Sequence, residues 1–194
     1  MHFDTHHRKR CQRINTPGHC HYLTFSCFHR RPFLLRDRTR NWFIDAIVAA
    51  KDKHPFDIFA WVIMPEHAHL LIRPTAAEPS ISAILKSIKL PVALRAIAYL
   101  DKNNPAGKQL LADRQPDSSV AYRFWQRGGG YDRNLVSANE IWEKIDYIHR
   151  NPVRRGLVAR TIDWAWSSAG EYASGDPGPL PLAYGVLPDR PQRR

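Results

Sequence analysis

The chain has 194 residues and a formal net charge of +11. That length suits one domain with a single sizeable core, and no apolar run reaches the roughly 18 residues that a transmembrane helix needs. The first residues lack the apolar stretch of a signal peptide, and three cysteines without CxxC spacing argue against a disulfide framework. We therefore expect a cytoplasmic protein with free thiols and no membrane partner.

The positive charge is concentrated in two segments. Residues 1–40 carry a net charge of +7 and residues 150–160 a net charge of +4, and together they supply the whole excess. Clustered arginines of this kind are typical of proteins that bind the phosphate backbone of nucleic acid. A basic protein with solvated tails is the alternative interpretation.

The first half of the chain predicts an arm followed by strands around a helix. Residues 1–18 look like an irregular basic arm, and residues 21–28 alternate as a strand does. Residues 38–54 have their apolar side chains at helical spacing. Residues 56–64 are apolar on both faces, which favours a central strand, and residues 67–73 follow as the second strand of an antiparallel hairpin.

A second helix is expected from Ile81, with Ser80 as its N-cap. Pro91 should kink or break this helix, because proline lacks the N–H that the helix uses, and a second helical piece should run to about Leu100. Residues 101–120 are polar and rich in turn formers, so we expect a mobile loop there.

The last part of the foldable chain contains a short strand candidate at 121–127, a flexible triglycine at 128–130 and a helix over 138–151 capped by Ser137. Residues 174–194 are rich in proline and end in basic residues, so we expect a poorly ordered tail. The order of elements predicts an α+β fold with helices packed on an antiparallel sheet, of the ferredoxin-like or RRM-like kind.

His67 and His69 lie two residues apart in a predicted strand. Residues at this spacing face the same way, so both imidazoles can converge on one cation. Spacing alone leaves a metal site and a pair of surface histidines equally open. A competing set, with Cys11, His19, His21 and Cys27 around zinc, has no pair at zinc-finger spacing.

The helix predicted over 138–151 offers partners for such a site. Tyr147 and Asn151 are four residues apart and therefore neighbours on one polar flank, about 100° from the buried isoleucine stripe. Read singly, Tyr147 is a half-buried aromatic residue and Asn151 a helix-ending residue before Pro152. Together with the arginines that follow, they form a plausible phosphate-handling surface.

Four segments resemble a known family, the REP-associated tyrosine transposases, where REP denotes repetitive extragenic palindromes. They are PEHAHLL (65–71), FWQR (124–127), DYIHRNPV (146–153) and WAWSS (164–168), in that order. The resemblance covers roughly residues 19–170, which places a transposase domain at 19–173 between the arm and the tail. It implies the HUH endonuclease fold, named for two histidines that flank an apolar residue.

The resemblance implies a role for each site residue. His67, His69 and Asn151 match the ligands of a Mg²⁺ or Mn²⁺ ion, and Tyr147 matches the nucleophile that forms a 5′-phosphotyrosine with single-stranded DNA. The implied partner is a DNA hairpin of a REP-like palindrome, and the implied location is the nucleoid. Basic residues near these motifs are predicted to bind DNA: Arg30, Arg31, Lys86, Lys89, Arg127, Arg150, Arg154 and Arg155.

Several alternatives remain open. Gly128–Gly130 stands where the family carries bulkier residues, and Tyr131 directly after it is a second candidate nucleophile. A protein of the same fold that binds DNA hairpins without cutting them is the second functional hypothesis, and an unrelated metal hydrolase or RNA-binding domain is the third. A monomer is the expected state, although related transposases of insertion sequences exchange the tyrosine helix between two subunits.

Overall fold

A computed structural model describes residues 14–192. Its centre is a four-stranded antiparallel sheet in the order β2-β3-β1-β6. The strands are β1 (Cys20–Ser26), β2 (Phe56–Ile63), β3 (His67–Pro74) and β6 (Tyr131–Leu135). Strand β3 is therefore an inner strand, with Thr24 of β1 opposite His69 on one side and Val62 of β2 opposite it on the other.

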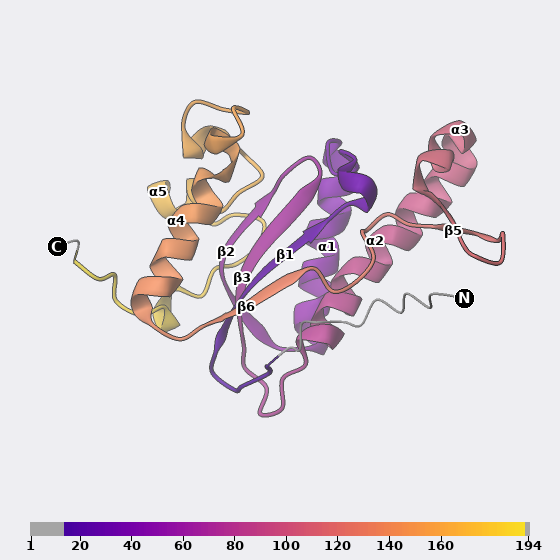
Figure 1. Ribbon diagram of the computed structural model, residues 1–194. Coiled ribbons are helices and arrows are strands. Elements are labelled where there is room, and N and C mark those ends of the chain that lie inside the picture. Colours follow the sequence, from indigo (N-terminus) through magenta and orange to yellow (C-terminus); the bar gives the residue numbers. More distant parts are fainter. Residues whose placement is uncertain (1–13, 193–194) are drawn as a thin grey trace, which may run out of the picture.

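Helices cover both faces of this sheet (Figure 1). Helices α1 (Asp37–Lys53) and α2 (Ile81–Asn103) pack together on one face, while α4 (Ala138–Arg154) and the short α5 (Ala169–Ser174) lie on the other. The order β1-α1-β2-β3-α2-β6 is the ferredoxin-like arrangement, so the predicted fold class is confirmed. The described residues also contain four 3-10 turns: η1 (Phe28–Arg30), η2 (Gln109–Leu111), η3 (Thr161–Asp163) and η4 (Tyr184–Val186).

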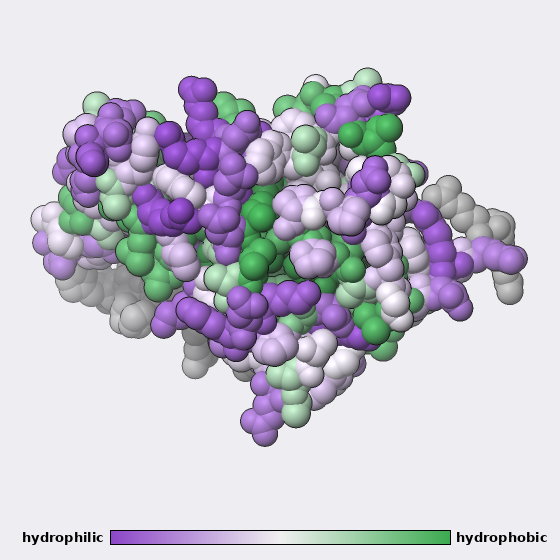
Figure 2. Space-filling model, turned by 180° about the vertical axis from the view of Figure 1, so that it is seen from behind, coloured by the Kyte–Doolittle hydropathy of each residue, from purple (hydrophilic) through white to green (hydrophobic). Residues whose placement is uncertain are grey.

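Alternation along the strands divides the core between the two faces. Phe25 of β1 packs with Phe43 of α1 on one face, whereas Tyr22 of the same strand packs with Ile145 of α4 on the other. Figure 2 shows one side of the surface, where hydrophobic residues show through near the middle and hydrophilic residues surround them. Within residues 14–192, no helix is long and apolar enough to cross a bilayer.

Helix α2 continues through Pro91, so the predicted break there was wrong. The cause is packing: Ile84, Ile88 and Val92 form one buried stripe that runs past the proline against the core. Pro91 itself points to solvent, where the carbonyl that loses its intrahelical partner can bind water. The Ser80 cap is confirmed, since its hydroxyl accepts from the backbone N–H of Ala83 at 3.3 Å.

Residues 101–120, for which composition predicted a mobile loop, contain regular elements. They form α3 (Pro105–Lys108) and most of a hairpin of β4 (Ala112–Arg114) and β5 (Val120–Tyr122), which projects beyond the end of α2 (Figure 1). The fourth strand of the main sheet is β6 and not the 121–127 segment. It was missed because an edge strand needs little apolar character, and Leu135 is its only buried residue.

Helix α4 begins with a capping box, in which Ser137 and Glu140 bind each other's backbone N–H groups. The helix runs to Arg154, beyond the end predicted at Asn151. Asn151 is therefore inside the helix, and its carbonyl accepts from the N–H of Arg155 at 3.1 Å. This places its side chain firmly one turn after Tyr147.

Residues 175–192, for which composition predicts a poorly ordered tail, lie against the domain. Leu180 is fully buried in the core, and Ala183 donates its backbone N–H to the carbonyl of Ile58 on β2 at 3.0 Å. Farther along, Trp142 of α4 donates its indole N–H to Pro188 at 2.9 Å, and Arg190 pairs with Asp146 at 2.8 Å. The segment therefore braces α4 as well as the sheet.

Leu180→Ala should lower the free energy of unfolding by about 2–5 kcal/mol, because it leaves a cavity at a fully buried site. Val186→Ala is the matched control in the same segment, where the side chain is exposed and the expected change is within about 0.5 kcal/mol. Urea denaturation of both variants measures the difference. Equal stability of the two would contradict the packing of this segment on the core.

Candidate active site

The two histidines predicted as a ligand pair converge in the structure. His67 and His69 project from the same face of β3, and their Nε2 atoms lie 3.0 Å apart. Both side chains are almost fully buried. The interpretation of this motif as two surface histidines is therefore wrong, and a joint site is geometrically possible.

Each imidazole is oriented through its other nitrogen. The Nδ1–H of His67 donates to the carboxylate of Glu66 at 3.1 Å, which leaves the Nε2 lone pair free. The Nδ1 atom of His69 lies 2.8 Å from the hydroxyls of both Tyr22 and Thr24 on β1. Arg155 binds the same Glu66 carboxylate at 2.9 Å and holds it in place.

Helix α4 brings the two remaining predicted residues to this pair. The side-chain amide of Asn151 lies 2.9 Å from Nε2 of His69. The ring of Tyr147, one turn earlier, meets the ring of His69 edge-on, with the centroids 5.8 Å apart. Sequence positions 67, 69, 147 and 151 thus form one cluster, in which α4 brings the pair at helical spacing to the pair at strand spacing.

A polar contact on the far side of α4 fixes the helix on the sheet. His149 lies 2.8 Å from the hydroxyl of Ser168, and the backbone N–H of Ser168 donates to the carbonyl of Trp61 on β2 at 3.0 Å. Trp164 also donates its indole N–H to Ile63 at 3.0 Å. These contacts determine how Tyr147 and Asn151 meet the histidines.

Burial keeps both imidazoles neutral. Desolvation lowers the pKa of His69 to about 3, and it also lowers the pKa of His67. Since a protonated imidazole cannot coordinate a metal, low pKa values favour a ligand role near pH 7. Without a cation, His69 can carry its proton on Nε2 and donate it to His67.

The geometry fits a small divalent cation. Metal–ligand bonds of about 2.0–2.1 Å place two ligands at right angles about 2.8–3.0 Å apart, and the two Nε2 atoms are 3.0 Å apart. The Asn151 amide presents its oxygen at the same point after a half-turn of its terminal group. In the described part of the chain no cluster of three His, Cys, Asp or Glu side chains offers another metal site.

A hollow of about 500 Å³ opens above this cluster, and its lining is strongly cationic. The ammonium group of Lys144 and the guanidinium of Arg154 lie 5.1 and 5.0 Å from the centre of the Tyr147 ring. Arg30 and Arg155 also line the hollow, so four positive side chains surround a space large enough for a phosphodiester. Tyr131, the other candidate nucleophile, lines the same hollow and is 55% exposed.

Arg30 reaches this hollow through an unusual turn. His29 and Arg30 both adopt left-handed backbone conformations, with φ angles of 52° and 54°. Two successive residues with side chains rarely take this conformation, and such strain clusters at functional sites. The turn directs Arg30 toward the histidines, which is consistent with its predicted role in binding phosphate.

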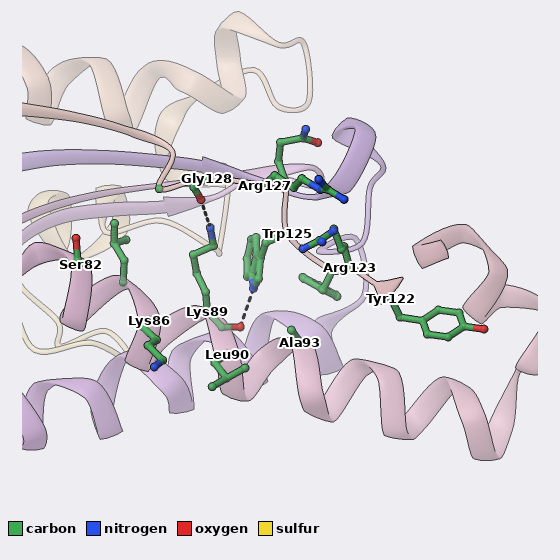
Figure 3. Close-up of a pocket in the computed structure, with 14 residues that line it drawn as sticks. Ser82, Lys86, Lys89, Leu90, Ala93, Tyr122, Arg123, Trp125, Arg127 and Gly128 are labelled. Carbon is green, nitrogen blue, oxygen red and sulfur yellow. Dashed lines mark hydrogen bonds between the residues drawn. The ribbon is translucent and has the colours of Figure 1, made fainter. Parts of the chain in front are cut away.

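The other predicted DNA-binding residues lie elsewhere. Lys86, Lys89 and Arg127 line a second groove between α2 and the segment before β6 (Figure 3). Arg31 donates to the carbonyl of Leu110 at 2.6 Å, and Arg150 lines a further hollow that Tyr147 also lines. The predicted set is therefore not one continuous surface.

Further residues are less available than their positions suggest. Trp125 of the FWQR motif is only 7% exposed, because its ring packs against Phe25 and Phe124. In the competing zinc set, His21 is instead bonded to Asp132 at 2.9 Å and Cys27 is buried in the core. Cys11 of that set lies outside the described residues.

Sequence reasoning assigned no role to Glu66, Lys144, Tyr22 or Thr24. The position of Glu66 directly before the first histidine is a usable signal. Tyr22 and Thr24 share a strand face by alternation, but only the pairing of β1 with β3 shows that this face meets His69. Lys144 precedes Tyr147 by three residues, a helical spacing that places the two side chains side by side.

Glu66→Ala should weaken Mn²⁺ binding about 10–100-fold, the usual effect of removing a carboxylate that orients a ligating histidine. Glu66→Gln should recover part of the affinity, since an amide oxygen still accepts from Nδ1–H of His67. Isothermal titration with Mn²⁺ alone measures both variants. Wild-type affinity in Glu66→Ala would show that this carboxylate does not orient a ligand.

The comparisons with known proteins point to one family. No family model matches the chain. A REP-associated tyrosine transposase of Escherichia coli (strain K12) is 26% identical over 157 residues, covering 81% of this chain and 80% of that protein. The chain resembles the REP-associated tyrosine transposases. A Haemophilus influenzae protein named for the same family is 27% identical over 145 residues, covering 70% of this chain and 75% of that protein.

The fold agrees as well. The solved structure of a REP-associated tyrosine transposase bound to a REP hairpin matches this chain with a TM-score of 0.66 at 21% identity. The match covers 94% of this chain and 98% of that one. The resemblance predicted from the four motifs is thus confirmed, with its HUH fold. Two of the four motifs contact each other in this chain. Ser168 of WAWSS lies 2.8 Å from His149 of DYIHRNPV, the motif that also contains Tyr147.

Proposed function

We propose that this protein is a metal-dependent endonuclease and strand transferase that acts on single-stranded DNA at REP-like hairpins. The observation that carries the proposal is the placement of Tyr147 and Asn151, one helical turn apart, against the converging Nε2 atoms of His67 and His69. The resemblance to REP-associated tyrosine transposases supports the same reaction.

In the proposed reaction the Tyr147 oxygen attacks the phosphorus of a phosphodiester. The new O–P bond makes a 5′-phosphotyrosine, the bond from phosphorus to the 3′ oxygen breaks, and that oxygen takes a proton to leave as a 3′-hydroxyl. The phenolic proton of Tyr147 is lost to solvent. The bond energy is retained, so a 3′-hydroxyl of another strand can reverse the step.

Other residues of this chain would assist the attack by Tyr147 and hold the phosphate and the metal ion. Tyrosine has a reference pKa of about 10 and is protonated near pH 7. Lys144 and Arg154 lie over the ring of Tyr147 and place positive charge beside the attacking group. Arg30 and Arg155 line the same hollow and would hold the phosphate. Mg²⁺ or Mn²⁺ held by His67, His69 and Asn151 would neutralise a phosphate oxygen.

The proposed partner is a DNA hairpin with an unpaired foot, as the hairpin bound in the related structure suggests. All four groups of the proposed centre come from a single chain. We therefore propose that the protein works as a monomer, in contrast to relatives that would need a partner's tyrosine. Its proposed location is the cytoplasm, in association with the nucleoid.

A labelled DNA hairpin with single-stranded flanks, incubated with the protein and Mn²⁺, tests the proposal on a denaturing gel. We expect a covalent protein–DNA band that requires the metal and disappears with EDTA. Hairpin binding without any such band, over REP sequences from several genomes and with both metals, would favour the second hypothesis, a protein that binds hairpins without cutting them.

A further inference from the structure

The groove between α2 and residues 122–129 is lined by residues that do not belong to the candidate active site. It measures about 450 Å³. Figure 3 shows Trp125 between two rows of side chains, with Lys86, Lys89 and Leu90 on α2 and with Arg123 and Arg127 on the opposite segment. Its floor is apolar and its rim is cationic.

Hydrogen bonds and ion pairs between the two walls and with the β4–β5 hairpin hold the groove in this shape. The indole N–H of Trp125 donates to the carbonyl of Lys89 at 2.9 Å, and the ammonium of Lys89 donates to the carbonyl of Gly128 at 3.2 Å. Arg123 and Arg127 both pair with Asp113 of the β4–β5 hairpin, and these ion pairs lower the pKa of that carboxyl to about 2. The rim carries four positive side chains, Lys86, Lys89, Arg123 and Arg127, and the Asp113 carboxylate offsets only one of these charges, so the rim is positive.

The groove lies on the α2 face of the sheet and the catalytic hollow on the α4 face, and Gly128–Gly130 connect the two along the sheet edge before β6. Gly128 and Gly129 line the groove, and Tyr131 lines the hollow. Between them, Gly130 lies directly on β1: a Cβ there would be 2.2 Å from the carbonyl of Thr24, which itself lines the hollow. No side chain at positions 128–130 stands between the two sites.

We propose that this groove holds the unpaired DNA strand that leaves the catalytic hollow, with the strand crossing over Gly128–Gly130. The inference rests on the proposed function. Single strands expose their bases, so the apolar floor with Leu90, 47% exposed, can take a base while the rim takes phosphates. A duplex keeps its bases stacked inside and offers only phosphates, so the floor specifically favours unpaired nucleotides.

Two groove variants and a charge-matched control test this by fluorescence anisotropy with a 20-nucleotide oligothymidylate. Lys86→Ala/Arg127→Ala should weaken binding about tenfold or more. It should also reduce the slope of log affinity against log salt by about 1.4, from two lost contacts at roughly 0.7 each. Leu90→Glu should weaken the single strand more than a 20-base-pair duplex. Lys53→Ala/Lys102→Ala, at exposed lysines outside both sites, should change neither quantity.

Wild-type affinity in both groove variants, or an equal loss for the single strand and the duplex, would overturn the proposal. Photocrosslinking tests the path of the DNA strand. Oligothymidylate carrying 5-iodouracil should label peptides of both the groove and the hollow, and labelling of the hollow alone would contradict the proposed path. The covalent band on a denaturing gel is an independent measurement. If the groove variants weaken binding but no covalent band forms, strand cleavage is refuted. If the covalent band forms but the groove variants bind DNA as the wild type does, the role of the groove is refuted.

Discussion

Tyr147→Phe should abolish covalent attachment to DNA, lowering the yield of the protein–DNA adduct by a factor of about 10³ or more. Phenylalanine keeps the ring and its edge contacts with His69 and Tyr22 but removes the attacking oxygen. DNA binding and thermal stability should stay near those of the wild type. Adduct formation on a denaturing gel, together with anisotropy of the same hairpin, separates loss of chemistry from loss of binding.

Tyr131→Phe is the matched control. Tyr131 lines the same hollow and is more exposed than Tyr147, but it lies on the edge strand β6 and has no predicted metal ligand one turn away. We expect this variant to cleave DNA within a fewfold of the wild type. If Tyr147→Phe still forms the adduct and Tyr131→Phe does not, Tyr131 is the nucleophile.

His69→Ala should reduce cleavage about 100-fold or more while hairpin affinity changes little. The ring supplies one of two Nε2 atoms that face each other at 3.0 Å, and several kcal/mol of charge neutralisation depend on a cation held there. His67→Ala should behave alike. Calorimetric titration with Mn²⁺ alone should show loss of the tight site in both variants.

His54→Ala is the control for removal of an imidazole, because His54 contacts Ser87 on the opposite side of the molecule and lines neither site. It should bind Mn²⁺ and cleave DNA as the wild type does. Since His69 is almost fully buried, its removal can also unfold the protein. Far-ultraviolet circular dichroism of each variant therefore accompanies the titration, and a folded His69→Ala protein that still cleaves DNA would refute the metal role.

Local periodicity was enough to predict the two residue pairs of the candidate site. Strand alternation placed His67 and His69 on one face, and helical spacing placed Tyr147 beside Asn151, both before any three-dimensional information. What periodicity could not give was the docking of α4 on that face of β3, for which the order of motifs in related proteins supplied the reason. The structure shows the contacts that achieve it, among them His149 with Ser168.

The parts that sequence reasoning missed depend on contacts between distant segments. Strand β6 is polar, and only pairing of residues such as Asp132 with Leu23 of β1 makes it a strand. Leu180 is buried because an extended, proline-rich segment crosses the core, which composition cannot show. The role of Glu66 follows from its contacts with both His67 and Arg155, and these lie almost ninety residues apart in the chain.

Mass spectrometry of the DNA adduct tests the central claim most directly. Trypsin releases Tyr147 in the peptide IDYIHR (145–150) and Tyr131 in GGGYDR (128–133), so the two candidate nucleophiles separate cleanly. After nuclease trimming, we expect IDYIHR to carry the added mass of a nucleotide 5′-phosphate on Tyr147. The same added mass on GGGYDR, with IDYIHR unmodified, would contradict it.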